Sequence, residues 1–228
     1  MHDHLPARWP ITSETTAADM RRWARAWLSD VVAGRGEVTA VRHPLGFLCF
    51  PVWRGGTLGI CVHVWCDGVH ARLTTSPIHA HSWDLVSFVL YGTVANEVVD
   101  VVDAAAPTHR IFEVRSDEDG DLVRATPRLV RHRHRSRELF GRGDTYRLPR
   151  GVFHLSDVRG NAATVVLGDY RPDCPDRSLG AVLGEDHRVY RIRCTAEETR
   201  RFARVVLERL ADSNTPRELE DRCDQARS

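Results

Sequence analysis

A long succession of short segments rich in β-branched and aromatic residues fills the middle of this 228-residue chain. Gly, Pro and Asp separate the segments, and these residues are typical of the turns between β-strands. Many short strands at regular spacing predict an all-β sandwich or barrel. We expect strands at residues 46–53, 58–65, 70–75, 85–91, 94–102, 110–115, 121–134, 144–148, 152–158 and 163–170.

A helix is expected on each side of this β region. Thr16 with Asp19, and Thr195 with Glu198, form capping-box patterns before apolar residues that recur at helical spacing. The patterns predict helices over residues 16–33 and 195–211. The chain then divides into an N-terminal helical extension (1–36), a β-barrel domain (37–192), and a C-terminal helix with a polar tail (193–228), which we expect to be partly disordered after Asn214.

The charges of the chain nearly cancel, with a formal net charge of +1. No overall field would attract nucleic acid or a membrane surface, so we expect a small-molecule partner. Lysine is absent, which excludes chemistry through a lysine Schiff base. The N-terminus lacks the apolar core of a signal peptide and no segment approaches the length of a membrane span, so we expect a cytoplasmic protein.

The cysteines do not form a recognisable motif. No CxxC pair occurs, so neither a zinc ribbon nor a disulfide framework is indicated. We expect most of them to be reduced and buried or half-buried. They are Cys49, Cys61, Cys66, Cys174, Cys194 and Cys223.

Two charged runs stand out. In residues 131–137 four arginines alternate with His132, His134 and a serine, which at strand spacing places the arginines on one face. A solvated edge face protected by charge is favoured over an anion site, and nucleic-acid binding is disfavoured because no aromatic residues are interleaved. The acidic run 116–121 is interpreted as a solvated hairpin tip, since it lacks the ligand spacing of an EF-hand calcium loop.

Three histidines suggest a metal site. His79 and His81 are one residue apart, so both side chains would point to the same face of a strand. His154 ends a strand-turn-strand pattern far along the chain. If the fold brings His154 to the other two, the three imidazoles form a facial set that leaves coordination positions open on a divalent transition metal.

These histidines lie in two motifs that resemble those of the cupin superfamily. The second cupin motif is matched at each fixed position except the trailing asparagine, where Val158 stands; the matching run is Gly143-x5-Pro149-x-Gly151-x2-His154. The first motif is matched by His79-Ala-His81 and Gly92. The resemblance covers roughly residues 45 to 170. It implies a double-stranded β-helix, or jelly roll, that holds a metal ion through His79, His81 and His154.

The glutamate of the first cupin motif is missing, because Leu85 occupies its position and Asp84 lies one residue away. Asp84 would reach the site only through a bulge, so Leu85 facing inward is favoured. A neutral three-histidine set resembles that of the thiol dioxygenases, such as cysteine dioxygenase, although the crosslinking cysteine of that enzyme would also fall at Leu85. The resemblance implies iron(II), with zinc, nickel or manganese as alternatives, and an anionic chelating substrate.

Five further residues are candidates for the surroundings of the metal. The resemblance to thiol dioxygenases suggests that Arg72 binds a substrate carboxylate and that Tyr170 is catalytic; a surface arginine is an equal alternative for Arg72. Tyr146 could donate a hydrogen bond at the reacting centre or pack in the core. Trp83 and His63 could line the substrate pocket or serve in packing alone.

Three functions follow from this site. The first is a mononuclear non-haem iron dioxygenase or oxygenase that acts with dioxygen on a small polar metabolite, thiol-like or amino-acid-like. The second is a lyase or isomerase in which the metal acts as a Lewis acid. The third is a ligand-binding cupin without catalysis. A homodimer is compatible with the apolar helix at 16–33, which could cover either the barrel or a second copy.

Overall fold

A computed structural model describes residues 16–212 except 68, 70, 118 and 171–173. The tail after Asn214 lies outside the described residues. The helices are α1 (Ala17–Val32) and α2 (Ala196–Asp212). The strands are β1 (Val41–His43), β2 (Phe47–Gly55), β3 (Leu58–Trp65), β4 (His79–Ala80), β5 (Asp84–Tyr91), β6 (Val94–Asp103), β7 (His109–Ser116), β8 (Gly120–Phe140), β9 (Thr145–Leu148), β10 (His154–Asp157), β11 (Ala162–Asp169), β12 (Asp176–Gly180), β13 (His187–Tyr190) and β14 (Ile192–Arg193).

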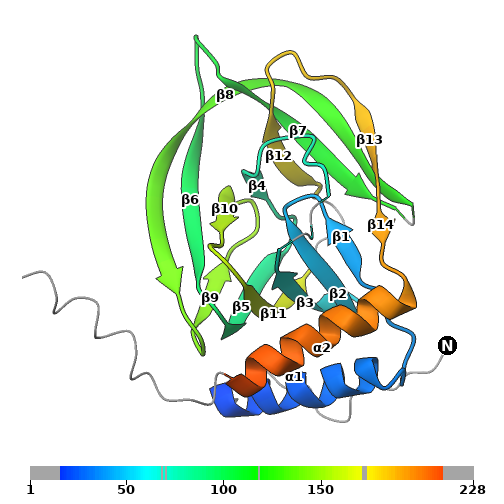
Figure 1. Ribbon diagram of the computed structural model, residues 1–228. Coiled ribbons are helices and arrows are strands. Elements are labelled where there is room, and N and C mark those ends of the chain that lie inside the picture. Colours follow the sequence, from blue (N-terminus) through cyan, green and yellow to red (C-terminus); the bar gives the residue numbers. More distant parts are fainter. Residues whose placement is uncertain (1–15, 68, 70, 118, 171–173, 213–228) are drawn as a thin grey trace, which may run out of the picture.

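The strands form two antiparallel sheets. The order in the first sheet is β14-β1-β2-β3-β11-β5-β9, and the order in the second is β13-β8-β6-β10-β4-β12-β7. The long strand β8 pairs with β7 through its first half and with β6 through its second half, so the second sheet curls back on itself. Figure 1 shows this curvature, with α1 and α2 side by side below the first sheet. The predicted fold, an all-β jelly roll with a helix at each end, is confirmed.

Both helices begin at the predicted capping boxes. The side chain of Thr16 accepts a hydrogen bond from the backbone N–H of Asp19, and the carboxylate of Asp19 accepts one from the backbone N–H of Thr16. Thr195 and Glu198 make the same reciprocal pair at the start of α2. Each pair satisfies backbone donors that have no partner within the helix, which fixes where the helix begins.

Neighbouring residues of the first sheet face two different environments. Leu48 and Phe50 of β2 are buried in a cluster with residues of both helices, among them Leu28 and Val206. Phe47 belongs to a separate buried cluster, which contains residues of β3, β5, β6 and β9. Because side chains alternate along a strand, the helices cover one face of the first sheet and the other face looks into the barrel.

The strand expected at residues 70–75 does not form. The described residues of this segment, 71–75, have no regular structure, and the next strand is the short β4. Just beyond the segment, the hydroxyl of Ser76 accepts a hydrogen bond from the backbone N–H of Ile78, on the other side of Pro77. Such a side-chain turn competes with strand pairing, and proline has no N–H to contribute.

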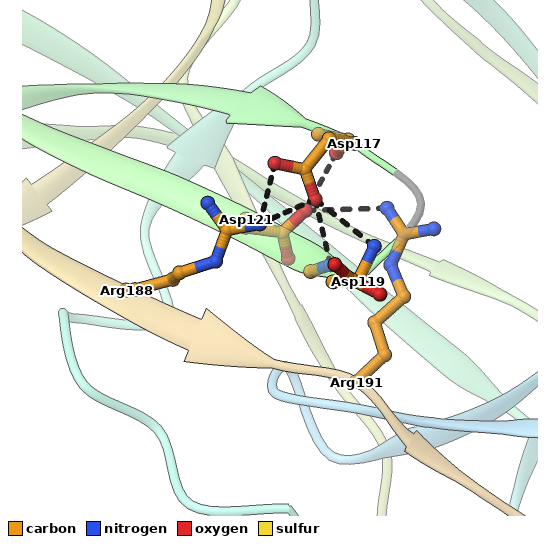
Figure 2. A network of polar contacts seen from close by, with 7 residues as sticks. Asp117, Asp119, Asp121, Arg188 and Arg191 are labelled. Atoms are coloured by element: carbon orange, nitrogen blue, oxygen red, sulfur yellow. Dashed lines mark hydrogen bonds and ion pairs between the residues drawn. The ribbon is translucent and has the colours of Figure 1, made fainter.

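The described residues of the acidic run, 116–117 and 119–121, lie where β7 passes into β8, as expected for a hairpin tip. The carboxylate of Asp117 accepts a hydrogen bond from the backbone N–H of Asp119 and from the guanidinium of Arg188 at 2.5 Å. Arg191 donates to the carboxylate of Asp121 at 3.2 Å, and its backbone N–H donates to the carbonyl of Asp119. Figure 2 shows the two arginines against the turn. Residues of this chain thus satisfy these carboxylates.

The arginine run lies in the second half of β8, where the described pairing is with β6 alone. All four of its arginines are exposed. Arg137 pairs with Glu97 and Asp157, and Arg135 lies 3.7 Å from Asp100. A register shift after Val98 interrupts the strict alternation that the sequence suggested. The run is therefore a charged strand edge.

The described residues also contain no helix long and apolar enough to cross a membrane.

Candidate metal centre

The second sheet brings the three histidines of the two motifs together. His79 opens β4, His81 follows directly after this strand, and His154 opens β10. The strands β4 and β10 are antiparallel neighbours, with His154 opposite His79. The turn before His154 is fixed to the first motif, because the backbone N–H of Gly151 donates to the carbonyl of His81 at 2.8 Å. Gly151 has φ of +77°, a conformation that favours glycine.

The imidazoles are close enough to share one ion. The Nε2 atoms of His79 and His81 are 3.2 Å apart. The ring of His154 lies 4.3 Å from that of His79 and 5.3 Å from that of His81, measured between centroids. One nitrogen from each residue lies within 4.8 Å of the others. Two nitrogens that each bind an ion at about 2.0–2.1 Å, with an angle between a right angle and a tetrahedral one, lie about 2.9–3.4 Å apart.

Hydrogen bonds at Nδ1 orient two of the rings. The Nδ1 atom of His79 contacts the carbonyl oxygen of Pro77 at 2.9 Å, and the Nδ1 atom of His154 contacts the Oδ1 atom of Asn96 at 2.9 Å. Both partner oxygens only accept, so each Nδ1 carries the proton and each Nε2 is unprotonated. The Nε2 atom of His79 then accepts from that of His81. This arrangement is typical of metal-binding histidines, whose second nitrogen is held by an outer partner.

Burial keeps the three imidazoles neutral. It is the main cause that lowers the pKa of His79 to about 4, and it lowers the pKa values of His81 and His154 well below their usual range. The mutual repulsion of the histidines acts in the same direction at His81 and His154. The Nε2 atom of His154 is buried and lacks a hydrogen-bond partner. A bound cation would satisfy this buried lone pair, so the three histidines fit a metal ion.

Leu85 and Asp84 lie as strand alternation requires. Leu85 is buried inside the barrel, in the cluster that includes Tyr146 and Leu148. Asp84 is exposed, and its carboxylate accepts a hydrogen bond from the backbone N–H of Arg150 at 2.9 Å. The cluster of potential ligands around His154 therefore consists of histidines alone among the described residues.

Two of the other predicted site residues, Trp83 and Tyr146, lie in or against the interior cluster of the barrel. The ring of Trp83 lies 4.3 Å from that of His81. Tyr146 is buried and stacks on Phe140, and burial raises the pKa of its hydroxyl against opposing contacts with Ser87 and Ser156. Tyr146 also lines a surface depression of about 370 Å³, as does Asn96, the partner of His154.

Arg72 and Tyr170 are placed less favourably. Arg72 is exposed in the irregular connection between β3 and β4, because the strand that was expected to carry it is absent. Tyr170 follows the end of β11 and is 48% exposed. Its backbone N–H donates to the carbonyl of Thr57 at 2.6 Å, which ties this position to the β2–β3 turn. Neither residue contacts the three histidines in the described interactions.

His63, a predicted site residue, lies on the opposite wall of the barrel, together with residues that the sequence interpretation missed. His43 stacks on Phe47 at 4.4 Å, and Phe47 stacks on His63 at 4.2 Å. Burial is the main cause that lowers the pKa of His43 to about 3, and His63 and His79 contribute. Cys49 and Cys61 lie beside His63. Cys61 and His63 are two residues apart in one strand, so alternation predicts that they share a face. Cys49 is in another strand, and only the register between β2 and β3 places it opposite His63.

No family model and no curated protein matches the sequence. Among solved structures, the chain is similar to an RmlC-like cupin from Shewanella frigidimarina, with 14% identity and a TM-score of 0.35 over 59% of this chain and 86% of that one. A cupin superfamily protein from Desulfitobacterium hafniense has 10% identity and a TM-score of 0.32, with 55% and 78% covered. An oxalate decarboxylase from Bacillus subtilis has 15% identity and a TM-score of 0.34, with 58% and 27% covered. We draw no functional conclusion from similarities at this level.

Proposed function

We propose that this protein is a mononuclear non-haem iron oxygenase of the three-histidine type, acting on a small metabolite that carries a thiolate or a carboxylate. The observation that carries the proposal is the donor set around His154. It consists of imidazoles that burial keeps neutral, and Leu85 occupies the position where a carboxylate would otherwise stand.

The charge of such a site selects its substrate. Three neutral ligands leave the full double charge of a divalent ion uncompensated inside the barrel, where charge is costly to bury. An anionic substrate that chelates the ion removes this cost. A neutral sugar or alcohol would not, so we propose a thiol- or amino-acid-like substrate with at least one anionic donor atom.

The chain would hold the ion through His79, His81 and His154. Iron(II) in this place would supply the redox chemistry that couples oxidation of the substrate to reduction of dioxygen. Pro77 and Asn96 keep the imidazoles oriented through the hydrogen bonds at Nδ1. The facial arrangement of the three side chains leaves one side of the ion open to ligands.

Two aromatic residues would shape the substrate side of the site. Trp83 packs against His81 and restricts the access of water to that ring. Tyr146 is buried in the same interior cluster as Leu85, and we assign its hydroxyl as a hydrogen-bond donor to the bound substrate. The hydroxyl is protonated at neutral pH, and burial raises its pKa further.

The test combines metal analysis with oxygen uptake. Iron in the purified protein, and oxygen consumption that depends on a thiol or amino acid with a carboxylate, is the expected result. Tyr146→Phe should lower turnover, whereas Tyr91→Phe, a change in the helix-side cluster, should not. A redox-inert metal without oxygen uptake would replace the proposal by a lyase or isomerase reaction, and a protein that binds no divalent metal would exclude both.

A further inference from the structure

A second group of potential metal ligands lies on the first sheet, and it shares no residue with the three histidines. Cys49 is in β2, and Cys61 and His63 are in the adjacent strand β3. Cys49 is directly opposite His63 in the antiparallel register, and Cys61 is opposite Pro51. The two sulfur atoms and one imidazole nitrogen all lie within 4.8 Å of one another.

These three residues face the interior of the barrel. Cys49 packs against the interior cluster that contains Phe47 and Trp65. The ring of His63 is held between these two aromatic residues, stacked on Phe47 at 4.2 Å and edge-on to Trp65 at 6.1 Å. The imidazole therefore has few alternative orientations, and restricting a donor in this way lowers the entropy cost of binding an ion.

The two thiols are already in contact with each other. A hydrogen bond from Cys49 is the main cause that lowers the pKa of Cys61 well below its usual range, and His63 acts in the same direction. Cys49, the donor, has a pKa raised well above the usual range. Both sulfurs are free rather than joined in a disulfide. The two sulfurs thus stand together beside His63, where one ion could bind both as thiolates.

We propose that Cys49, Cys61 and His63 form a second metal site, selective for a thiophilic ion such as Zn²⁺. Two thiolates and one imidazole are a donor set that zinc prefers, with a fourth position for water or another ligand. The two thiolates neutralise the charge of a divalent ion, so this site needs no anionic substrate. Binding would release the remaining thiol protons to solvent.

The chain offers a matched pair of cysteines without such a site. Cys66 and Cys194 lie on the helix side of the first sheet, Cys194 in the helix-side cluster and Cys66 packed against it. Burial raises the pKa values of both thiols. No third donor completes a group with these two cysteines among the described residues. They provide the control for burial alone.

The first experiment titrates the reduced full-length protein with Co²⁺, which replaces Zn²⁺ and gives a thiolate-to-metal charge-transfer band. We expect the band in the wild type, its loss in Cys61→Ser and in Cys49→Ser, and its retention in Cys66→Ser. His81→Ala should keep the band, which separates this site from the histidine site and from the proposed oxygenase. A wild type without the band, or a band that persists in Cys61→Ser, would overturn the proposal.

A second experiment needs no variant and is therefore independent of any effect on folding. The reduced wild-type protein is alkylated with and without Zn²⁺, and the modified cysteines are mapped by mass spectrometry. We expect Zn²⁺ to lower the alkylation rates of Cys49 and Cys61 at least tenfold and to leave those of Cys66 and the exposed Cys174 unchanged. Equal rates with and without Zn²⁺ at Cys49 and Cys61 would contradict the proposal.

Discussion

The two donor groups inside the barrel differ in both charge and support. The histidine group on the second sheet offers three neutral nitrogens, two of which are oriented by Pro77 and Asn96. The group on the first sheet offers two sulfurs and one nitrogen, which contact mainly each other and the aromatic ring of Phe47. A divalent ion would remain strongly positive in the histidine group and become nearly neutral in the group of Cys49, Cys61 and His63.

This difference separates two uses of a metal. A positive ion in a buried site attracts an anionic substrate and therefore suits chemistry on that substrate. A neutralised ion attracts no such ligand and suits a stabilising role between strands, as structural zinc sites do.

Replacing His154 by alanine should remove the metal from the histidine group and leave the group at Cys49 intact. Loss of an outer hydrogen-bond partner alone typically costs about 10–100-fold in metal affinity, so loss of a ligand should cost at least about 100-fold. Metal content after dialysis against a weak chelator measures the effect. Full iron retention by His154→Ala would show that the histidines do not form the site.

Leu48→Ala should lower stability without changing either donor group. Leu48 is fully buried against the helices, whereas its neighbour Cys49 faces the barrel. We expect a loss of about 2–5 kcal/mol in the free energy of unfolding, as for other buried leucines. Chemical denaturation measures this loss, and metal analysis of the folded variant should give the wild-type stoichiometry. A changed stoichiometry would mean that the two faces of the sheet are not independent.

Asn96→Ala should weaken metal binding at the histidine group by about 10–100-fold, because the ring of His154 loses the acceptor that orients it. Asn96→Asp, which keeps an oxygen acceptor, should retain most of the affinity. Competition with a metallochromic chelator gives both values. Equal affinities in wild type and Asn96→Ala would show that this hydrogen bond has no part in binding. The Cys49 group should respond to neither change.

The metal-free protein should lose stability as the pH falls from 6.5 toward 4. His79 has a folded-state pKa of about 4 and His43 one of about 3, both below the usual 6.5. In this window the unfolded chain binds more protons than the folded one. The stability that the neutral His43 and His79 contribute is therefore fully present above pH 6.5 and is lost as the pH falls toward their folded-state pKa values.

His43→Phe should reduce this pH dependence by about 1.4 kcal/mol per pH unit, the contribution of one proton. Urea denaturation at several pH values provides the comparison, with Cys66→Ser as a control that should keep the wild-type slope. A slope that His43→Phe leaves unchanged would mean that His43 is not among the groups that cause the pH dependence.

Much of the fold could be predicted because its signals are local. The capping boxes at Thr16 and Thr195 mark helix starts through contacts over three residues. Long strands such as β3, β5 and β6 follow from runs of β-branched residues. The short strands β12, β13 and β14 were not predicted, since their polar sequences form strands only through pairing with β4, β7, β8 and β1.

The candidate site, like the fold, was predicted from the sequence only in part. The two motifs indicated that His79, His81 and His154 belong together, and alternation indicated that Leu85 faces inward. The strand expected around Arg72 does not form: residues 71–75 are irregular, and the turn at Ser76 and Pro77 follows them. Asn96 carried no sequence signal at all, since its role depends on lying within reach of His154 across two strands.

The sequence by itself determined the two helices, the longer strands, the absence of lysine chemistry and the histidines of the two motifs, because each rests on residue type and short spacing. Only the tertiary structure decided which distant side chains share the barrel interior. The register between β2 and β3 brought Cys49 to His63, and the pairing of β4 with β10 brought His79 to His154. Strand register is set by packing of the whole sheet, and a shift of one residue would turn each of these donors to the opposite face.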